Sequence, residues 1–105
     1  MASMGAGGPD LDRLNFRYRI SGSHPAWRPV QVFDDGRQTF VAFPSTVAEG
    51  DMPPLFVIGA DGKSTELVNY RVEGRHMVVD RLFQTAELRM GDGRSAERVR
   101  IEKAR

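Results

Sequence analysis

The chain has 105 residues, enough for one domain with a single modest core. Its formal net charge of +1 gives no global field that favours nucleic acid or an anionic membrane. It contains no cysteine, which excludes disulfides, thiolate metal sites and a cysteine nucleophile. No apolar run approaches the roughly 20 residues that a membrane-spanning helix needs.

The first residues differ in composition from the rest. Met1–Leu11 combines two methionines with several glycines and lacks the apolar stretch of a signal peptide. We expect residues 1–11 to be a disordered leader of the kind that a vector adds. Residues 12–105 are then the folded domain, cut from a longer protein.

The first predicted strand is Asn15–Ser21, because apolar and polar residues alternate along it. Alternation places the apolar side chains against a core and the arginines on the opposite face. The two expected faces are Phe16, Tyr18 and Ile20 on the core side, and Arg17 and Arg19 on the other side.

A hairpin is predicted next, from the strands Val30–Phe33 and Gln38–Phe43. The residues Asp34-Asp35-Gly36 lie between them, and this composition is typical of a tight turn. Gly36 is expected to supply a positive φ, and an aspartate side chain is expected to cap the turn.

Pro44 ends the hairpin and begins a polar loop that continues to Pro54, with a short helical turn expected near Thr46–Glu49. Turn residues then separate further β-prone segments, and a bulge is expected over residues 81–85. The remaining predicted strands are Leu55–Ile58, Thr65–Val72, His76–Asp80, Ala86–Met90 and Arg98–Glu102. About eight short strands without an amphipathic helix predict an all-β fold, either a small barrel or, as we expect, an antiparallel β-sandwich.

Side chains capable of catalysis are few. Asp34 and Asp35 are adjacent carboxylates, but strands on both sides favour a role in the turn. Ser45, His76 and Asp80 supply the residue types of a hydrolase without a nucleophile-elbow motif. The two histidines lack metal-ligand spacing, and the glycines form no phosphate loop. We therefore expect no enzyme activity, no cofactor, no metal and no small-molecule substrate.

Aromatic and basic residues alternate in the first strand, which leaves a second function open. Three aromatic residues beside three arginines resemble the stacking surface of a single-strand nucleic-acid binder of the OB type: Phe16, Tyr18 and Trp27, with Arg17, Arg19 and Arg28. Because Phe16 and Tyr18 share a face with Ile20, a core role is favoured. Trp27 either caps one end of the sandwich or is an exposed anchor for a partner.

The first and last strands are the natural edges of an open sandwich, where unpaired backbone groups invite an added strand. Both carry outward arginines, which either protect the edge from aggregation or contact a partner. The residues that we select as candidates for partner binding are Arg17, Tyr18, Arg19, Ile20, Trp27, Arg98, Val99, Arg100 and Ile101.

The middle of the chain resembles a known family. The segment Pro29–Pro44 is similar to a characteristic segment of the TrbG/CagX family, the ninth VirB component of type IV secretion and conjugal transfer systems. Pro54–Val57, Val68–Val72 and Val78–Phe83, the last continuing to Gly91, fit in the same order.

This resemblance implies that the chain is the C-terminal domain of such a protein, a non-enzymatic β-sandwich in the outer-membrane core complex. That domain is implied to lie in the periplasm, at the outer membrane of a Gram-negative bacterium, and to self-associate in the assembled ring. The implied partners are the extended N-terminal tail of a small outer-membrane lipoprotein (the seventh VirB component) and the channel-forming tenth component.

The absence of cysteine is a departure, because some members bridge covalently to the lipoprotein. Any such contact here is therefore expected to be non-covalent.

Overall fold

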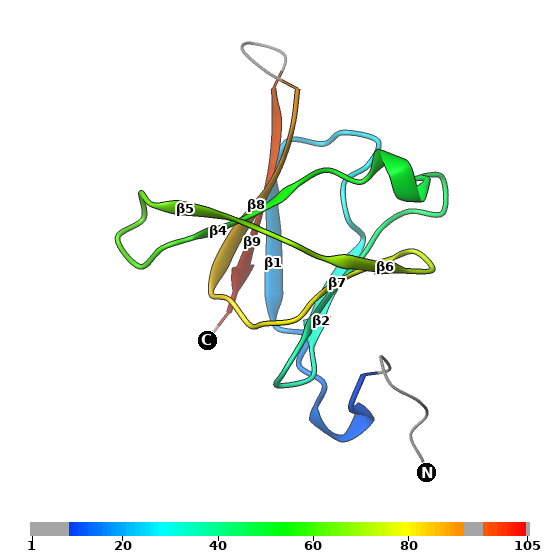
Figure 1. The fold of residues 1–105 in the computed structure, drawn as a ribbon, viewed down its shortest axis with the longest axis vertical. Coiled ribbons are helices and arrows are strands. Elements are labelled where there is room, and N and C mark those ends of the chain that lie inside the picture. Colours follow the sequence, from blue (N-terminus) through cyan, green and yellow to red (C-terminus); the bar gives the residue numbers. More distant parts are fainter. Residues whose placement is uncertain (1–8, 92–95, 105) are drawn as a thin grey trace.

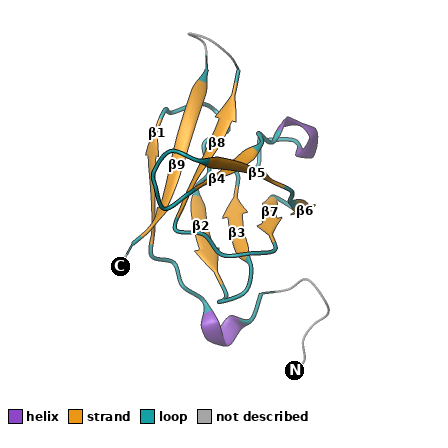
Figure 2. Cartoon of the chain, turned by 60° about the vertical axis from the view of Figure 1, so that its left-hand side comes forward, coloured by secondary structure: helices purple, strands orange, loops and turns teal. Residues whose placement is uncertain are grey.

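The computed structural model describes residues 9–91 and 96–104 and places most of them in two antiparallel sheets (Figure 1 and Figure 2). These residues form nine strands: β1 (Tyr18–Gly22), β2 (Gln31–Asp34), β3 (Thr39–Ala42), β4 (Leu55–Ile58), β5 (Thr65–Val68), β6 (Arg71–Glu73), β7 (His76–Val79), β8 (Thr85–Met90) and β9 (Glu97–Lys103). One sheet has the order β1-β9-β8-β4-β5, and the other has the order β2-β3-β7-β6. The predicted all-β sandwich is confirmed, with nine strands instead of about eight.

The helical content of the described residues is small. Two 3-10 turns are present, η1 (Leu11–Arg13) and η2 (Glu49–Asp51). Neither approaches the length and apolarity that a membrane-crossing helix requires, and no other described helix does.

The core lies between the two sheets, where the alternating apolar side chains of each strand meet. Val99 and Ile101 of β9 and Leu88 of β8 are fully buried on the inner face of the five-stranded sheet. Val41 and Met77 face them from the four-stranded sheet, also without exposed surface. Burying a side chain of this size stabilises the fold by about 1.5–3 kcal/mol, so this layer is the main driving force for folding.

The predicted β2–β3 hairpin is confirmed. β2 and β3 pair antiparallel, with Phe33 opposite Phe40. Gly36 has φ +87°, a conformation that L residues with a side chain rarely adopt. The turn chemistry expected from Asp34-Asp35-Gly36 therefore forms.

Two predictions in the second half of the chain are wrong, because the chain changes sheets where a single element was expected. The segment Thr65–Val72 is not one strand: β5 pairs with β4 in the larger sheet, and β6 pairs with β7 in the smaller one (Figure 1). Tyr70 lies in this crossing, and its hydroxyl donates to the carbonyl oxygens of Met52 and Pro53 at 3.3 and 3.1 Å. Likewise, residues 81–84 connect β7 to β8 in the other sheet and are not a bulge.

The first strand is shorter than predicted for the same reason. Asn15 bridges to Asp34 of the smaller sheet, and β1 joins the larger sheet only from Tyr18. The expected shared face is therefore broken: Phe16 is 50% exposed and packs on Phe33 at 5.1 Å between ring centroids. Phe33 belongs to a second apolar cluster on the smaller sheet, which is separate from the main core.

The last strand is not an edge. β9 lies between β1 and β8 and is hydrogen-bonded on both sides, so the prediction that Arg98–Glu102 forms an edge is wrong. The edges are β1 and β5 in one sheet and β2 and β6 in the other. The first strand is an edge, as predicted.

The remaining local predictions have mixed outcomes. The helical turn expected near Thr46–Glu49 forms slightly later, over Glu49–Asp51. Residues 1–8 of the expected leader lie outside the described residues, and Leu11 begins η1. Of the turns expected between the β-prone segments, the last one, at residues 91–94, lies mostly outside the described residues.

Candidate protein-binding surfaces

Three of the nine candidate contact residues belong to the core. Val99 and Ile101 are fully buried on the inner face of β9. Trp27 is 8% exposed and packs in the same cluster, so it caps the sandwich and is not an exposed anchor. Its indole Nε1 is the buried side-chain polar atom for which the described residues provide no hydrogen-bond partner.

The other six candidates lie on β1, β9 or the residue just before β1. Tyr18 and Ile20 are half-buried and face inward, packed against the core. The four arginines are at least partly accessible. Arg19, Arg98 and Arg100 extend from the outer face of the larger sheet, and Arg17 lies just before β1.

The backbone of β1 presents a free edge. Arg17 O accepts from Ala104 N at 2.7 Å, and Ser23 N donates to Arg98 O at 2.9 Å. Because hydrogen-bonding direction alternates along a strand, the N–H and C=O groups of Ile20 point away from β9. They face the side on which the larger sheet has no further strand.

The side chain of Arg28 covers part of this edge. Its guanidinium donates to Ile20 O at 2.9 Å and to Ser23 O at 3.0 Å, with a longer contact of 3.4 Å to Gly22 O. A side chain thus occupies acceptors that a neighbouring strand would otherwise bind. This arrangement protects the edge without closing it.

At its end, β1 approaches β9 so closely that only glycine fits. Gly22 has φ +100°, and a Cβ atom there would lie 2.5 Å from the carbonyl oxygen of Arg98. The close approach fixes where β1 separates from β9 and turns toward Trp27 and Arg28.

Beside Tyr18, the first residue of β1, the buried Asp34 carboxylate is a hub of hydrogen bonds. It accepts hydrogen bonds from Tyr18 Oη at 2.5 Å, Asn15 Nδ2 at 3.2 Å and Gly36 N at 2.8 Å, and Lys103 Nζ lies 3.6 Å away. Burial opposes its ionisation, but these hydrogen bonds outweigh burial and lower the pKa of Asp34. Burial and the neighbouring carboxylate raise the pKa of Tyr18.

Asp35 also acts within the turn. Its Oδ1 accepts from the N–H groups of Arg37 at 3.0 Å and Gln38 at 2.8 Å, and its Oδ2 accepts from Asp10 N at 3.0 Å. Burial opposes ionisation here too, and the backbone donors prevail and lower the pKa of Asp35. Both carboxylates are held as ionised acceptors, so neither is poised as a general base near neutral pH.

The residues with hydrolase chemistry do not converge. His76 begins β7 and Asp80 follows its last residue, so about 13 Å of extended chain separates them. His76 packs edge-on against Phe33, while Asp80 accepts from Gln38 and Arg71. Across the described part of the chain, no group of three or more potential metal ligands is present.

The aromatic rings of the first strand do not form a stacking platform. Phe16 lies on the second apolar cluster of the smaller sheet, whereas Tyr18 points inward toward Phe83, with 6.3 Å between ring centroids. A single-strand binder needs such rings in a row on a basic surface. The geometry therefore gives the OB-type alternative no support.

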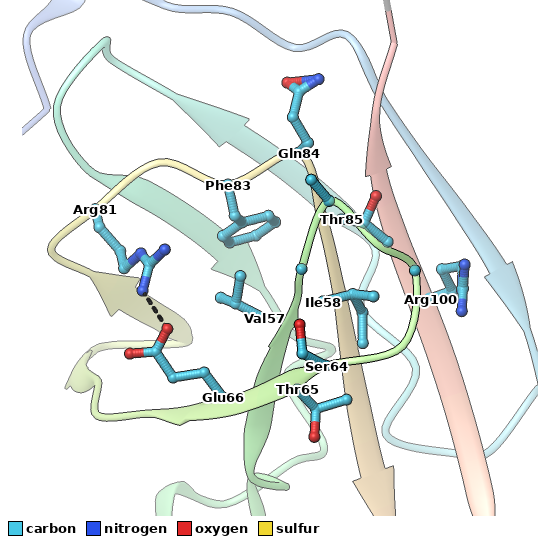
Figure 3. A pocket seen from close by; sticks show the side chains of 13 residues that line it. Val57, Ile58, Ser64, Thr65, Glu66, Arg81, Phe83, Gln84, Thr85 and Arg100 are labelled. Carbon is cyan, nitrogen blue, oxygen red and sulfur yellow. Dashed lines mark hydrogen bonds and ion pairs between the residues drawn. The ribbon is translucent and has the colours of Figure 1, made fainter.

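A cavity of about 740 Å³ opens beside the β4–β5 hairpin (Figure 3). Val57 and Phe83 provide an apolar wall, and Arg81 forms an ion pair with Glu66 at 3.1 Å across one side. Arg100 lines the opposite side. The cavity thus combines apolar surface with a basic rim.

An ionic cluster covers the outer face of β8 and β9. Glu87 is 8% exposed, and its Oε1 accepts from Arg89 Nε at 2.9 Å. Its Oε2 accepts from Arg100 Nε and Nη2 at 3.2 and 2.8 Å. Burial opposes ionisation of Glu87, yet the two arginines lower its pKa. The Arg89 guanidinium also lies 4.5 Å from the centre of the Phe56 ring.

Sequence reasoning missed Glu87 and Arg89, and it considered Arg28 only for nucleic-acid binding and not as cover for the β1 edge. Strand alternation places Glu87 and Arg89 on one face, and that signal was available in the sequence. No local pattern indicates that Arg28 folds back to β1, because this contact depends on the path of residues 23–30.

The described residues thus form an all-β sandwich with a partly covered sheet edge and an ionic outer face. The family model CagX, described as "Conjugal transfer protein", matches residues 2–104. The chain therefore belongs to the CagX family of conjugal transfer and type IV secretion proteins.

Two relatives support this membership. "Probable conjugal transfer protein TrbG" of Sinorhizobium fredii is 37% identical over 99 residues, which cover 94% of this chain and 36% of the relative. "Protein virB9" of Agrobacterium fabrum is 32% identical over 77 residues, which cover 73% of this chain and 25% of the relative. The chain thus spans about a third or less of each relative's length. The predicted resemblance to this family is confirmed.

Proposed function

We propose that this domain is a non-enzymatic assembly module of a type IV secretion core complex. In this proposal it binds the extended N-terminal tail of a small outer-membrane lipoprotein and packs against the channel-forming core component. It acts in the periplasm at the outer membrane of a Gram-negative bacterium, and copies associate in the assembled ring.

The observation that carries tail binding is the edge of β1. Backbone groups of Ile20 point away from β9, and a side chain, that of Arg28, fills the acceptor positions that another strand would use. An extended peptide can displace this side chain and pair with the edge, since backbone pairing provides affinity without a preformed pocket. The exposed arginines beside the edge, Arg17 and Arg19, are available to contact the same peptide.

Amide hydrogen exchange tests this assignment. We expect the outward N–H of Ile20 to exchange at least about tenfold more slowly when the lipoprotein's N-terminal peptide is bound. The inward N–H groups of Arg19 and Ser21 already pair with β9 and serve as internal controls. A scrambled peptide of the same composition controls for non-specific binding.

Two results would contradict the proposal. Absence of binding would remove lipoprotein recognition altogether. Binding that leaves Ile20 exchange unchanged and protects amides of β5 instead would show that the tail uses the opposite edge.

A further inference from the structure

We propose that the outer face of the five-stranded sheet is a second binding surface, and that it takes an acidic, extended segment of a partner protein. We call it the arginine face and define it by Arg89, Arg98 and Arg100. It differs from the β1 edge in using side chains, so the proposal does not depend on tail binding.

The strand register concentrates positive charge on this face. Arg89 of β8 lies directly opposite Arg98 of β9, and Arg100 follows two residues later on the same side of β9. Like charges in opposed positions destabilise a sheet. The described acids on the face are Glu87 and Glu102, which leaves more guanidinium groups than carboxylates.

Glu87 does not accept all the hydrogen bonds that the neighbouring arginines can donate. Glu87 uses one N–H of Arg89 and two of Arg100, and each guanidinium has five N–H groups. Arg98 is exposed and forms no ion pair with any residue that the structure describes. Donors therefore remain for a second anion.

The donors of Arg89 and Arg100 are held in place before any ligand arrives. Glu87 is buried and bonded to both arginines, and Arg89 is further fixed against Phe56. A guanidinium fixed in this way loses little side-chain entropy on binding, and its geometry matches a carboxylate. The arrangement favours carboxylate side chains over a diffuse counterion atmosphere.

The surroundings favour an extended peptide. Leu67 of β5 is 64% exposed at the border of the face, next to Phe56 in the strand register. Gly59 N donates to Ser64 O, so these two residues form a hydrogen-bonded pair between the two ends of the hairpin. Because hydrogen-bonding direction alternates along a strand, the backbone N–H and C=O of Leu67 point away from β4, toward the free side of β5. Arg100 also lines the cavity beside β4 and β5, so an apolar side chain can be accommodated beside an acidic one (Figure 3). A single-stranded nucleic acid would stack its bases on open aromatic rings, and Arg89 covers Phe56.

The test compares two charge reversals in the whole chain. Arg98→Glu alters the face without removing a described ion pair, and Arg37→Glu makes the same net-charge change on the β2–β3 turn. The probe is a labelled synthetic peptide of alternating glutamate and valine, with alternating glutamine and valine as its neutral control. We expect salt-sensitive binding of the acidic peptide, weakened about tenfold by Arg98→Glu and within about twofold of wild type for Arg37→Glu.

Trp27 fluorescence and thermal unfolding confirm that each variant is folded, and an Arg98→Gln variant is expected to bind with intermediate affinity. Equal binding of the acidic and neutral peptides, or no binding of either, would overturn the proposal. It would also be overturned if Arg98→Glu abolished binding to a single-stranded oligonucleotide or an anionic vesicle and left binding of the acidic peptide unchanged.

Discussion

Two Asp-Gly hairpin turns in the described part of the chain have similar local chemistry and different structural roles. In the β4–β5 turn, Asp61 Oδ1 accepts from Lys63 N, Ser64 N and Ser64 Oγ, all at 2.9 Å and all within three residues. In the β2–β3 turn, Asp34 accepts from Tyr18 and Asn15, which lie 16 and 19 residues away. Asp34 is 3% exposed, whereas Asp61 is on the surface.

The difference shows that turn chemistry and tertiary connection are separate properties. Both turns use a positive-φ glycine, Gly36 at +87° and Gly62 at +74°. Only the first turn lies where the chain passes from one sheet to the other, at the bridge between Asn15 and Asp34. The Asp34 carboxylate, which precedes the Asp-Gly pair of this turn, therefore links the two sheets, while Asp61 organises only its own hairpin.

The largest loss of stability is expected for Asp34→Ala. This change leaves the half-buried Tyr18 hydroxyl and the Gly36 N–H without their acceptor and removes the ionic partner of Lys103. Loss of about 3 kcal/mol in the free energy of unfolding is expected. Urea titration followed by the fluorescence of Trp27, the single tryptophan, measures it. A loss below about 1 kcal/mol would show that Asp34 does not connect the sheets.

The pH dependence of stability tests whether Asp34 stabilises the fold in its ionised form. The pKa of Asp34 is lower in the folded protein than in the unfolded chain, where it is about 3.9. The stability that ionised Asp34 contributes is therefore fully present above the unfolded pKa and is lost as the pH falls through the folded pKa. Wild type and Asp34→Asn are therefore expected to differ at neutral pH and to converge in acid. Urea midpoints measured from neutral to acidic pH test this. A gap that stays constant would contradict an ionised Asp34 hub.

Alternation and turn residues predicted the sandwich because the residues of each strand alone show which of its faces is apolar. β4 and the β2–β3 hairpin were predicted well for this reason. The sheet crossings were not predicted, because Asn69-Tyr70 and residues 15–17 continue an alternating pattern while the strand changes partners. Partner choice depends on packing across the whole domain, and a local pattern does not contain it.

The candidate site was predictable to the same limited extent. Alternation correctly placed Arg17 and Arg19 outward, and the first strand is an edge. Assigning β9 to an edge failed because the last strand in sequence can be inserted between earlier ones. Val99 and Ile101 were consequently taken for contact residues although they are core residues.

A smaller loss in the free energy of unfolding, equal in both turns, is expected for Gly36→Ala and Gly62→Ala. Each places an L side chain at positive φ, at a cost of about 1 kcal/mol. A new Cβ atom would meet only Arg13 Cδ at 3.8 Å at position 36, and no heavy atom within 4 Å at position 62. Equal shifts in urea midpoint would show that the turns differ through their carboxylates. A much larger loss at Gly36 would place part of the difference in the backbone.

The smallest effect is expected for Asp61→Ala. The hydrogen bonds that Asp61 accepts are local, and solvent can replace them when the side chain is removed, because the donors of Lys63 and Ser64 are exposed. The urea midpoint should stay close to that of wild type, while the amides of Lys63 and Ser64 exchange faster. Faster exchange with unchanged global stability is the behaviour of a turn that opens on its own. A loss of stability comparable to that of Asp34→Ala would instead mean that the β4–β5 hairpin is as tightly coupled to the core as the β2–β3 hairpin.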